Sequence, residues 1–69
     1  MKMTPVSSSN LSAIGYDRGT MHIRFNSGGT YAYYDVPEDV YRDLMNADSK
    51  GRYFNYHIKG QYDDTKISR

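Results

Sequence analysis

The sequence predicts an α+β fold in which a three-stranded antiparallel β-meander is followed by two short helices packed on one sheet face (βββαα). Two observations support it. Between residues 10 and 36, apolar and polar side chains alternate, which is the period of a half-buried strand, and glycine-containing turns interrupt the alternation twice. From Pro37 onward, apolar residues recur at helical spacing instead.

Three strands separated by two turns are expected at residues 12–16, 21–25 and 30–36. In the second strand, Met21, Ile23 and Phe25 alternate with polar side chains, and the third is rich in Thr, Tyr and Val, which suit a pleated surface. Gly19 lies in the first turn, and Gly28 and Gly29 form the second. Glycine suits such turns because it adopts the positive φ that tight hairpins require.

The two helices have recognisable boundaries. Pro37 suits the first helical position because the N–H that it lacks would have no partner there, and two acidic residues follow it at the positive end of the helix dipole. Asp48 or Ser49 is expected to cap the second helix, which ends near Lys59 with Gly60 as its stop.

The length indicates one small domain, and the composition argues against an enzyme. We expect a flexible N-terminal segment (1–9), a single domain (10–60) and a frayed polar tail (61–69). A chain of 69 residues buries only about 60% of its unfolded surface, which leaves little room for a deep substrate cavity. There is no cysteine, and His22 and His57 show no metal-site spacing. No catalytic residues, metal or cofactor are therefore expected.

The composition favours a monomeric cytoplasmic protein without a membrane contact. No run of about 20 apolar residues is present. The first residues lead into a polar, serine-rich stretch instead of the apolar core of a signal peptide. Charge is uneven along the chain: residues 35–48 contain five acids and one arginine, a net charge of −4, whereas residues 49–62 carry +3. The second stretch can therefore present a local basic patch.

Five segments together resemble the KTSC domain, and they lie at residues 8–10, 14–17, 31–33, 35–37 and 47–58. The resemblance extends over about residues 6–62. This family is named after a module at the C terminus of some lysyl-tRNA synthetases and also occurs as stand-alone bacterial or phage proteins. It implies a domain without an established function, for which the synthetase context suggests RNA binding. Asp63 and Asp64 stand where family members tend to have Pro and another aromatic residue, which argues against a nucleic-acid contact from the tail.

Tyrosine provides the candidate binding groups, since eight of the ten aromatic residues are Tyr. The roles of Tyr31 and Tyr33 depend on the register of the third strand. A turn with an even number of residues before that strand would place both rings beside Arg24 on an open sheet face, where they could stack on nucleic-acid bases. An odd turn with a glycine bulge would reverse the faces and bury both rings in the core. The core interpretation is favoured because so small a sheet has few apolar residues to spare.

The start of the second helix is another candidate site. Ser49, Gly51 and the free backbone N–H groups, with Lys50 and Arg52 beside them, could hold a phosphate or carboxylate. Alternatively, Ser49 is an ordinary cap, and Gly51 allows close packing against the first helix or the sheet.

The leading hypothesis is a non-enzymatic module that binds RNA or single-stranded nucleic acid. Tyr31 and Tyr33 would stack on bases, and Asn55 would hydrogen-bond a base edge or ribose. Four basic residues would neutralise phosphates, and these are Arg24, Lys50, Arg52 and Lys59. The alternative is a protein–protein interaction or accessory module, because Tyr and Arg are also enriched at protein interfaces and a net charge of +1 suits a protein partner.

Overall fold

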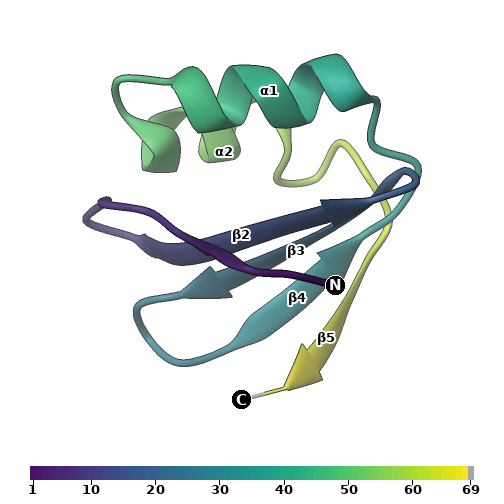
Figure 1. Ribbon diagram of the computed structural model, residues 1–69, viewed down its shortest axis with the longest axis horizontal. Helices are drawn as coiled ribbons and strands as arrows, with labels where there is room; N and C mark the ends of the chain where they lie inside the picture. The colour runs from purple at the N-terminus through teal and green to yellow at the C-terminus, as the bar shows by residue number, and fades with distance from the viewer. Residues whose placement is uncertain (69) are drawn as a thin grey trace.

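A five-stranded antiparallel sheet carries two helices on one face in the computed structural model, which describes residues 1–68 (Figure 1). The elements in chain order are β1 (Thr4–Pro5), β2 (Leu11–Asp17), β3 (Thr20–Phe25), β4 (Thr30–Tyr33), α1 (Glu38–Asn46), α2 (Lys50–His57) and β5 (Asp64–Ser68). The order of the strands in the sheet is the order of the strands in the chain. The predicted α+β class, the antiparallel sheet and the two helices are confirmed, but the number of strands is not.

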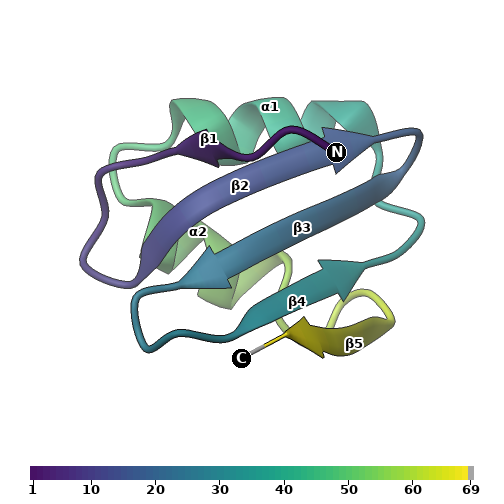
Figure 2. The same ribbon diagram turned by 60° about the horizontal axis from the view of Figure 1, so that its bottom comes forward.

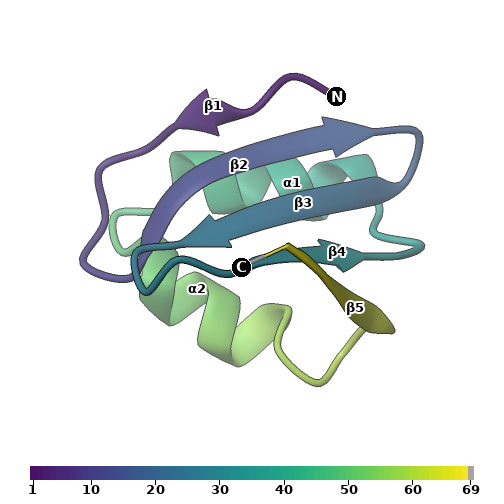
Figure 3. The same ribbon diagram turned by 90° about the horizontal axis from the view of Figure 1, so that it is seen from below.

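The two additional strands lie at opposite edges of the sheet (Figure 3). β1 pairs with β2, and β5 pairs with β4. Both come from segments expected to be flexible or frayed, residues 1–9 and 61–69, of which Arg69 lies outside the described residues. All residues of β5 are exposed, so this strand shows no alternation of apolar and polar side chains. Backbone hydrogen bonds hold it to β4, and these leave no signature in the side-chain pattern.

The central strands and the helices lie close to their predicted positions, with one clear exception. β4 ends at Tyr33, whereas the sequence predicted a strand to residue 36. Asp35 adopts φ +58°, a left-handed conformation that a β-strand cannot contain. The chain therefore leaves the sheet after Tyr33 and turns towards α1, whose N-cap is Pro37.

The turn between β3 and β4 has an odd number of residues. The backbone N–H of Phe25 donates to the carbonyl of Gly29 at 2.8 Å, which leaves residues 26–28 as a three-residue loop. Gly28 has φ +110°, as a loop closed by a glycine bulge requires.

This turn places the central tyrosines on the face covered by the helices. Tyr31 lies opposite Ile23, and Tyr33 lies opposite Met21. Because directly paired residues project to the same side of a sheet, both rings share the face of these two buried residues. Arg24 follows Ile23 in the same strand and therefore projects to the opposite face. Figure 2 shows that no helix covers this face. The predicted stacking platform of Tyr31 and Tyr33 beside Arg24 is therefore wrong, and the core alternative is correct for Tyr33, which is 3% exposed.

The core lies between the sheet and the two helices. Its buried residues come from every element except the edge strands, and they are Leu11, Ile14, Met21, Ile23, Tyr33, Val36, Leu44, Phe54 and Ile58. Leu44 is the buried residue of α1, and Phe54 is the buried residue of α2. The Phe54 ring contacts Phe25 of β3 and Tyr33 of β4, so α2 lies over these two strands.

Candidate nucleic-acid interface

The start of α2 is held by Ser49, one of the two predicted caps. The Ser49 hydroxyl accepts a hydrogen bond from the backbone N–H of Arg52 at 3.3 Å. Lys50 is turned back towards the end of α1, where its Nζ donates to the carbonyl of Ala47 at 3.3 Å. The Lys50 ammonium therefore ties the two helices together, and it does not line the cavities described next.

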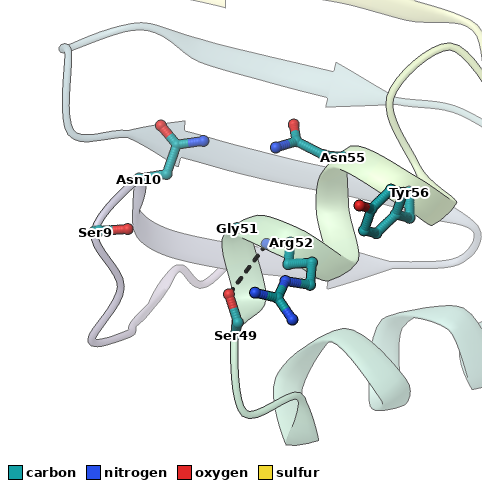
Figure 4. A pocket seen from close by; sticks show the side chains of 7 residues that line it. All are labelled: Ser9, Asn10, Ser49, Gly51, Arg52, Asn55 and Tyr56. Atoms are coloured by element: carbon teal, nitrogen blue, oxygen red, sulfur yellow. Dashed lines mark hydrogen bonds between the residues drawn. The ribbon is translucent and has the colours of Figure 1, made fainter.

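A first cavity of about 610 Å³ lies beside the N-terminal half of α2 (Figure 4). Its lining comes from α2 and from the loop before β2, and it comprises Ser9, Asn10, Ser49, Gly51, Arg52, Asn55 and Tyr56. Arg52 is the charged residue of this lining, and no carboxylate is part of it. The Tyr56 side chain is 72% exposed. The cavity is thus a polar, locally basic hollow with an aromatic ring at its rim.

The loop that forms the far wall of this cavity is fixed by hydrogen bonds. The Ser8 hydroxyl accepts from the backbone N–H of Asn10 at 3.2 Å. Asn26, in the β3–β4 turn, donates its backbone N–H to the Asn10 carbonyl at 2.9 Å and its side-chain amide to the Ser8 carbonyl at 3.1 Å. Asn10 is therefore held in position facing α2.

Gly51 is the point at which α2 approaches this loop. A Cβ atom built at Gly51 would lie 3.4 Å from the Asn10 Cβ, which is ordinary van der Waals contact. The close neighbour of Gly51 is thus the loop before β2. The alternative predicted from the sequence is close packing of Gly51 against the first helix or the sheet instead. An alanine would fit here, so steric exclusion does not account for the glycine.

A second cavity of about 340 Å³ lies beside the C-terminal half of α2, between this helix and the edge of the sheet. Its lining comprises Asn10, Phe25, Ser27, Tyr31, Tyr33, Phe54, Asn55, Lys59 and Asp64. Asn10 and Asn55 line both cavities, so the two hollows are adjacent. We refer to the two together as the α2 groove.

Aromatic rings form the apolar part of the second cavity. The ring of Phe25 meets those of Tyr31 and Phe54 edge-on, with centroids 5.7 and 5.2 Å apart, and Phe54 meets Tyr33 at 5.6 Å. Such edge-to-face contacts hold the rings in one arrangement. The cavity therefore combines packed apolar side chains with a few polar groups, which is typical of ligand sites.

Charged side chains of both signs surround the second cavity, and they come from the end of α2 and from β5. Burial, and secondarily the carboxylate of Asp64 and the phenol of Tyr31, raise the pKa of Tyr33 to about 12. Tyr33 is therefore neutral throughout the physiological pH range. The Nζ of Lys66 lies 6.0 Å from the centroid of the Tyr31 ring, and Lys59 lines the cavity from the end of α2.

Four of the seven predicted site residues line the α2 groove with accessible side chains, and they are Arg52, Asn55, Tyr31 and Lys59. The other three do not fit their predicted roles. Tyr33 is buried, Arg24 lies on the opposite sheet face, and Lys50 is hydrogen-bonded to the inter-helix segment.

Sequence reasoning missed several groove residues, among them Asn10, Tyr56 and Asp64. Tyr56 could have been found, because it lies four residues after Arg52 and therefore projects from the same side of α2. Asn10 and Asp64 reach the groove only through the pairing of the sheet, which no local pattern reveals.

Comparison with known proteins identifies close relatives. A family model described as the KTSC domain matches residues 7–62. The crystal structure of a KTSC domain protein from Yersinia pestis superimposes with a TM-score of 0.93 at 43% identity, covering 97% of each chain. A protein of Tsukamurella paurometabola is 44% identical over 62 residues, which is 87% of this chain and 92% of the relative.

A similar stretch also occurs in a much larger protein. The lysine–tRNA ligase of Nostoc punctiforme is 47% identical over 49 residues. These residues are 71% of this chain but only 9% of the ligase.

Two further findings concern residues 1–68. Neither helix there has the length and apolar character needed to cross a membrane. In the same residues, no three His, Cys, Asp or Glu side chains are grouped so that they could hold a metal ion.

Proposed function

The chain belongs to the KTSC domain family, and we propose that it is a small non-enzymatic module that binds RNA or another single-stranded nucleic acid along the α2 groove. One observation carries the proposal: two adjacent cavities share Asn10 and Asn55, with Arg52 lining one and Lys59 lining the other. Adjacent hollows with separated cations suit a flexible strand with regularly spaced phosphates.

The groove also offers partners for bases. Tyr56 is exposed and Tyr31 is half-buried, so each presents part of a ring surface. Stacking of a base on an aromatic side chain contributes about 1–3 kcal/mol. The amides of Asn10 and Asn55 can each donate and accept hydrogen bonds, which suits base edges and ribose hydroxyls. Tyr31 and Tyr56 thus take the stacking role first assigned to Tyr31 and Tyr33.

The charge of the groove sets the expected strength of binding. Arg52 and Lys59 in the groove, and Lys66 beside the Tyr31 ring, can each contact one phosphate, whereas the whole chain has a net charge of only +1. Three contacts on a single strand correspond to a log-affinity versus log-salt slope of about −2. Binding should therefore be moderate and strongly dependent on salt.

The relatives support an RNA ligand in one respect. A stretch similar to this chain occurs in proteins named lysine–tRNA ligase, whose name includes an RNA. A nucleic-acid ligand and the absence of cysteine are both consistent with a cytoplasmic location, which is part of the proposal.

A protein partner is the second candidate. The exposed Tyr56 ring favours it, because large aromatic side chains often anchor protein interfaces. Retention of one protein from a lysate on immobilised domain, unaffected by salt, would favour this candidate. Nucleic-acid binding should instead collapse as salt is raised.

Fluorescence anisotropy with a labelled mixed-sequence single-stranded RNA tests the RNA proposal. Binding is expected at low salt, and Arg52→Ala and Lys59→Ala should each weaken it severalfold. Arg24→Ala is the matched control, because it removes the same charge from the opposite sheet face. If no RNA binds at about 50 mM salt, the proposal is wrong. If Arg24→Ala weakens binding more than Arg52→Ala does, the RNA lies on the other face.

A further inference from the structure

We infer that the second cavity of the α2 groove holds a single nucleobase and that Asp64 selects guanine there. This inference rests on the proposed function and adds a base preference to it. Three features of the cavity support it, namely its size, its apolar side chains and the two opposite charges that line it. The donor pattern of the guanine edge matches these charges.

The size and lining of the cavity suit a planar aromatic ligand. Its volume of about 340 Å³ is near the lower end of the range for small-molecule sites, roughly 300–1,000 Å³. Phe25, Tyr31 and Phe54 are held in edge-to-face contacts that leave ring surface at the cavity. A nucleobase has apolar faces and a polar edge, so it can contact the rings with its faces while its edge reaches the polar groups.

Two opposite charges line this cavity without pairing. Asp64 lies at the start of β5 and Lys59 lies just beyond α2. Among residues 1–68, neither forms an ion pair, since the ion pairs there join Arg18 to Asp17 and Arg42 to Glu38. A ligand with adjacent donors and acceptors can satisfy both groups at once.

Asp64 argues against phosphate at this position and in favour of a base edge. A carboxylate repels phosphate. For this reason the pair Asp63 and Asp64, seen in the sequence alone, argues against a nucleic-acid contact from the tail. An ionised carboxylate can accept two hydrogen bonds. The edge of unpaired guanine presents two neighbouring donors, N1–H and N2–H₂, and its O6 and N7 are acceptors that a lysine can contact.

The other bases match this arrangement less well. On its Watson–Crick edge, adenine or cytosine presents one amino donor beside a ring-nitrogen acceptor, and this acceptor repels a carboxylate. Uracil presents one N–H between two carbonyl oxygens. Guanine is therefore the base that places two donors against Asp64.

The test uses uridine-rich single-stranded RNAs that differ at one central base. The full chain is titrated with RNAs carrying guanine, inosine, adenine, cytosine or uracil at that position. We expect guanine to bind about tenfold more tightly than adenine, cytosine or uracil. Inosine, which lacks the N2 amino group, should be intermediate.

Asp64→Asn should remove the preference, and Asp63→Asn is the matched control. Asparagine keeps one acceptor, adds a donor and removes a negative charge. The RNAs without guanine should therefore bind at least as tightly as before, while the guanine advantage disappears. Asp63 is the adjacent acid in the chain and is not part of the cavity lining, so its variant should keep the preference. Thermal unfolding of both variants checks that the fold is unchanged.

The outcomes separate the inference from the proposed function. Equal binding of all five RNAs would overturn the guanine inference and leave RNA binding intact. A guanine preference that survives Asp64→Asn would overturn the role of Asp64. If none of the RNAs binds, both the inference and the proposed function are wrong.

Discussion

Tyr16 of β2 stacks on Tyr41 of α1, with ring centroids 4.7 Å apart and ring planes 13° from parallel. The Tyr16 hydroxyl also donates a hydrogen bond to the backbone carbonyl of Val36, in the segment that leads into α1. A single side chain therefore joins the first helix to the sheet in two ways.

Tyr16→Phe should lower the free energy of unfolding by about 0.5–1.5 kcal/mol, because it removes this hydrogen bond and keeps the stacked ring. Tyr34→Phe is a suitable control, since Tyr34 is 37% exposed, and its effect should stay within about 0.5 kcal/mol. Urea denaturation of both variants measures the difference. Equal stability of the two variants would show that the Tyr16 hydroxyl does not stabilise the fold.

Ser49→Ala should destabilise the domain by about 1 kcal/mol, because the Ser49 hydroxyl caps α2 by accepting from the Arg52 N–H. Asp48→Ala is the matched control, since Asp48 is the neighbouring residue that was also a candidate cap. Thermal unfolding distinguishes them. A larger loss of stability for Asp48→Ala would show that Ser49 is not the residue that caps α2.

The stability of the fold should fall at high pH. Tyr33 has a raised pKa of about 12 in the folded chain, against an ordinary value near 10, so folding favours its neutral form. The contribution of the neutral Tyr33 phenol to the free energy of unfolding is complete below pH 10 and is lost as the pH rises from about 10 to 12. The loss can reach roughly 2–3 kcal/mol.

Chemical denaturation between pH 9 and 12, compared with Tyr33→Phe, checks this prediction. The phenylalanine variant should lose less stability over this interval, because it has no proton to release. Parallel pH profiles for the two chains would contradict a raised pKa at Tyr33.

Gly51→Ala should separate stability from binding. The added methyl group fits in ordinary contact with Asn10, and alanine is favoured over glycine in a helix by about 1 kcal/mol, so the variant should be as stable as the parent or more stable. The same methyl group narrows the first cavity, so RNA affinity should fall. Increased stability with unchanged affinity would mean that RNA does not enter this cavity.

Gly60→Ala is the contrasting variant. Gly60 has φ +76°, which an alanine adopts only with strain, so this substitution should destabilise the domain by about 1 kcal/mol. It does not alter the lining of either cavity. RNA affinity, measured well below the unfolding temperature, should therefore be unaffected.

The central strands and the helices could be predicted because burial imposes a period on them. Met21 and Ile23 alternate with polar residues, and Pro37 begins the helical pattern. The register of β4 could not be predicted, because the parity of the turn at residues 26–28 decides it and glycines allow either form. β5 is wholly exposed and therefore has no period to detect.

Half of the candidate groove is visible in the sequence. Arg52 and Asn55 are three residues apart, so their position on one side of α2 follows from helical geometry, and Lys59 comes just after the helix. Asn10 and Asp64 come from the two ends of the chain. They meet α2 only because β2 and β5 lie where the sheet places them, and this depends on long-range pairing.

Amide and side-chain NMR shifts during titration with single-stranded RNA test most directly whether the α2 groove is the binding surface. Shifts are predicted at Arg52 and at the side-chain amides of Asn10 and Asn55, reduced at higher salt, with Arg24 on the opposite face unchanged. Shifts confined to Arg24 and its sheet face, or no shifts at low salt, would contradict it.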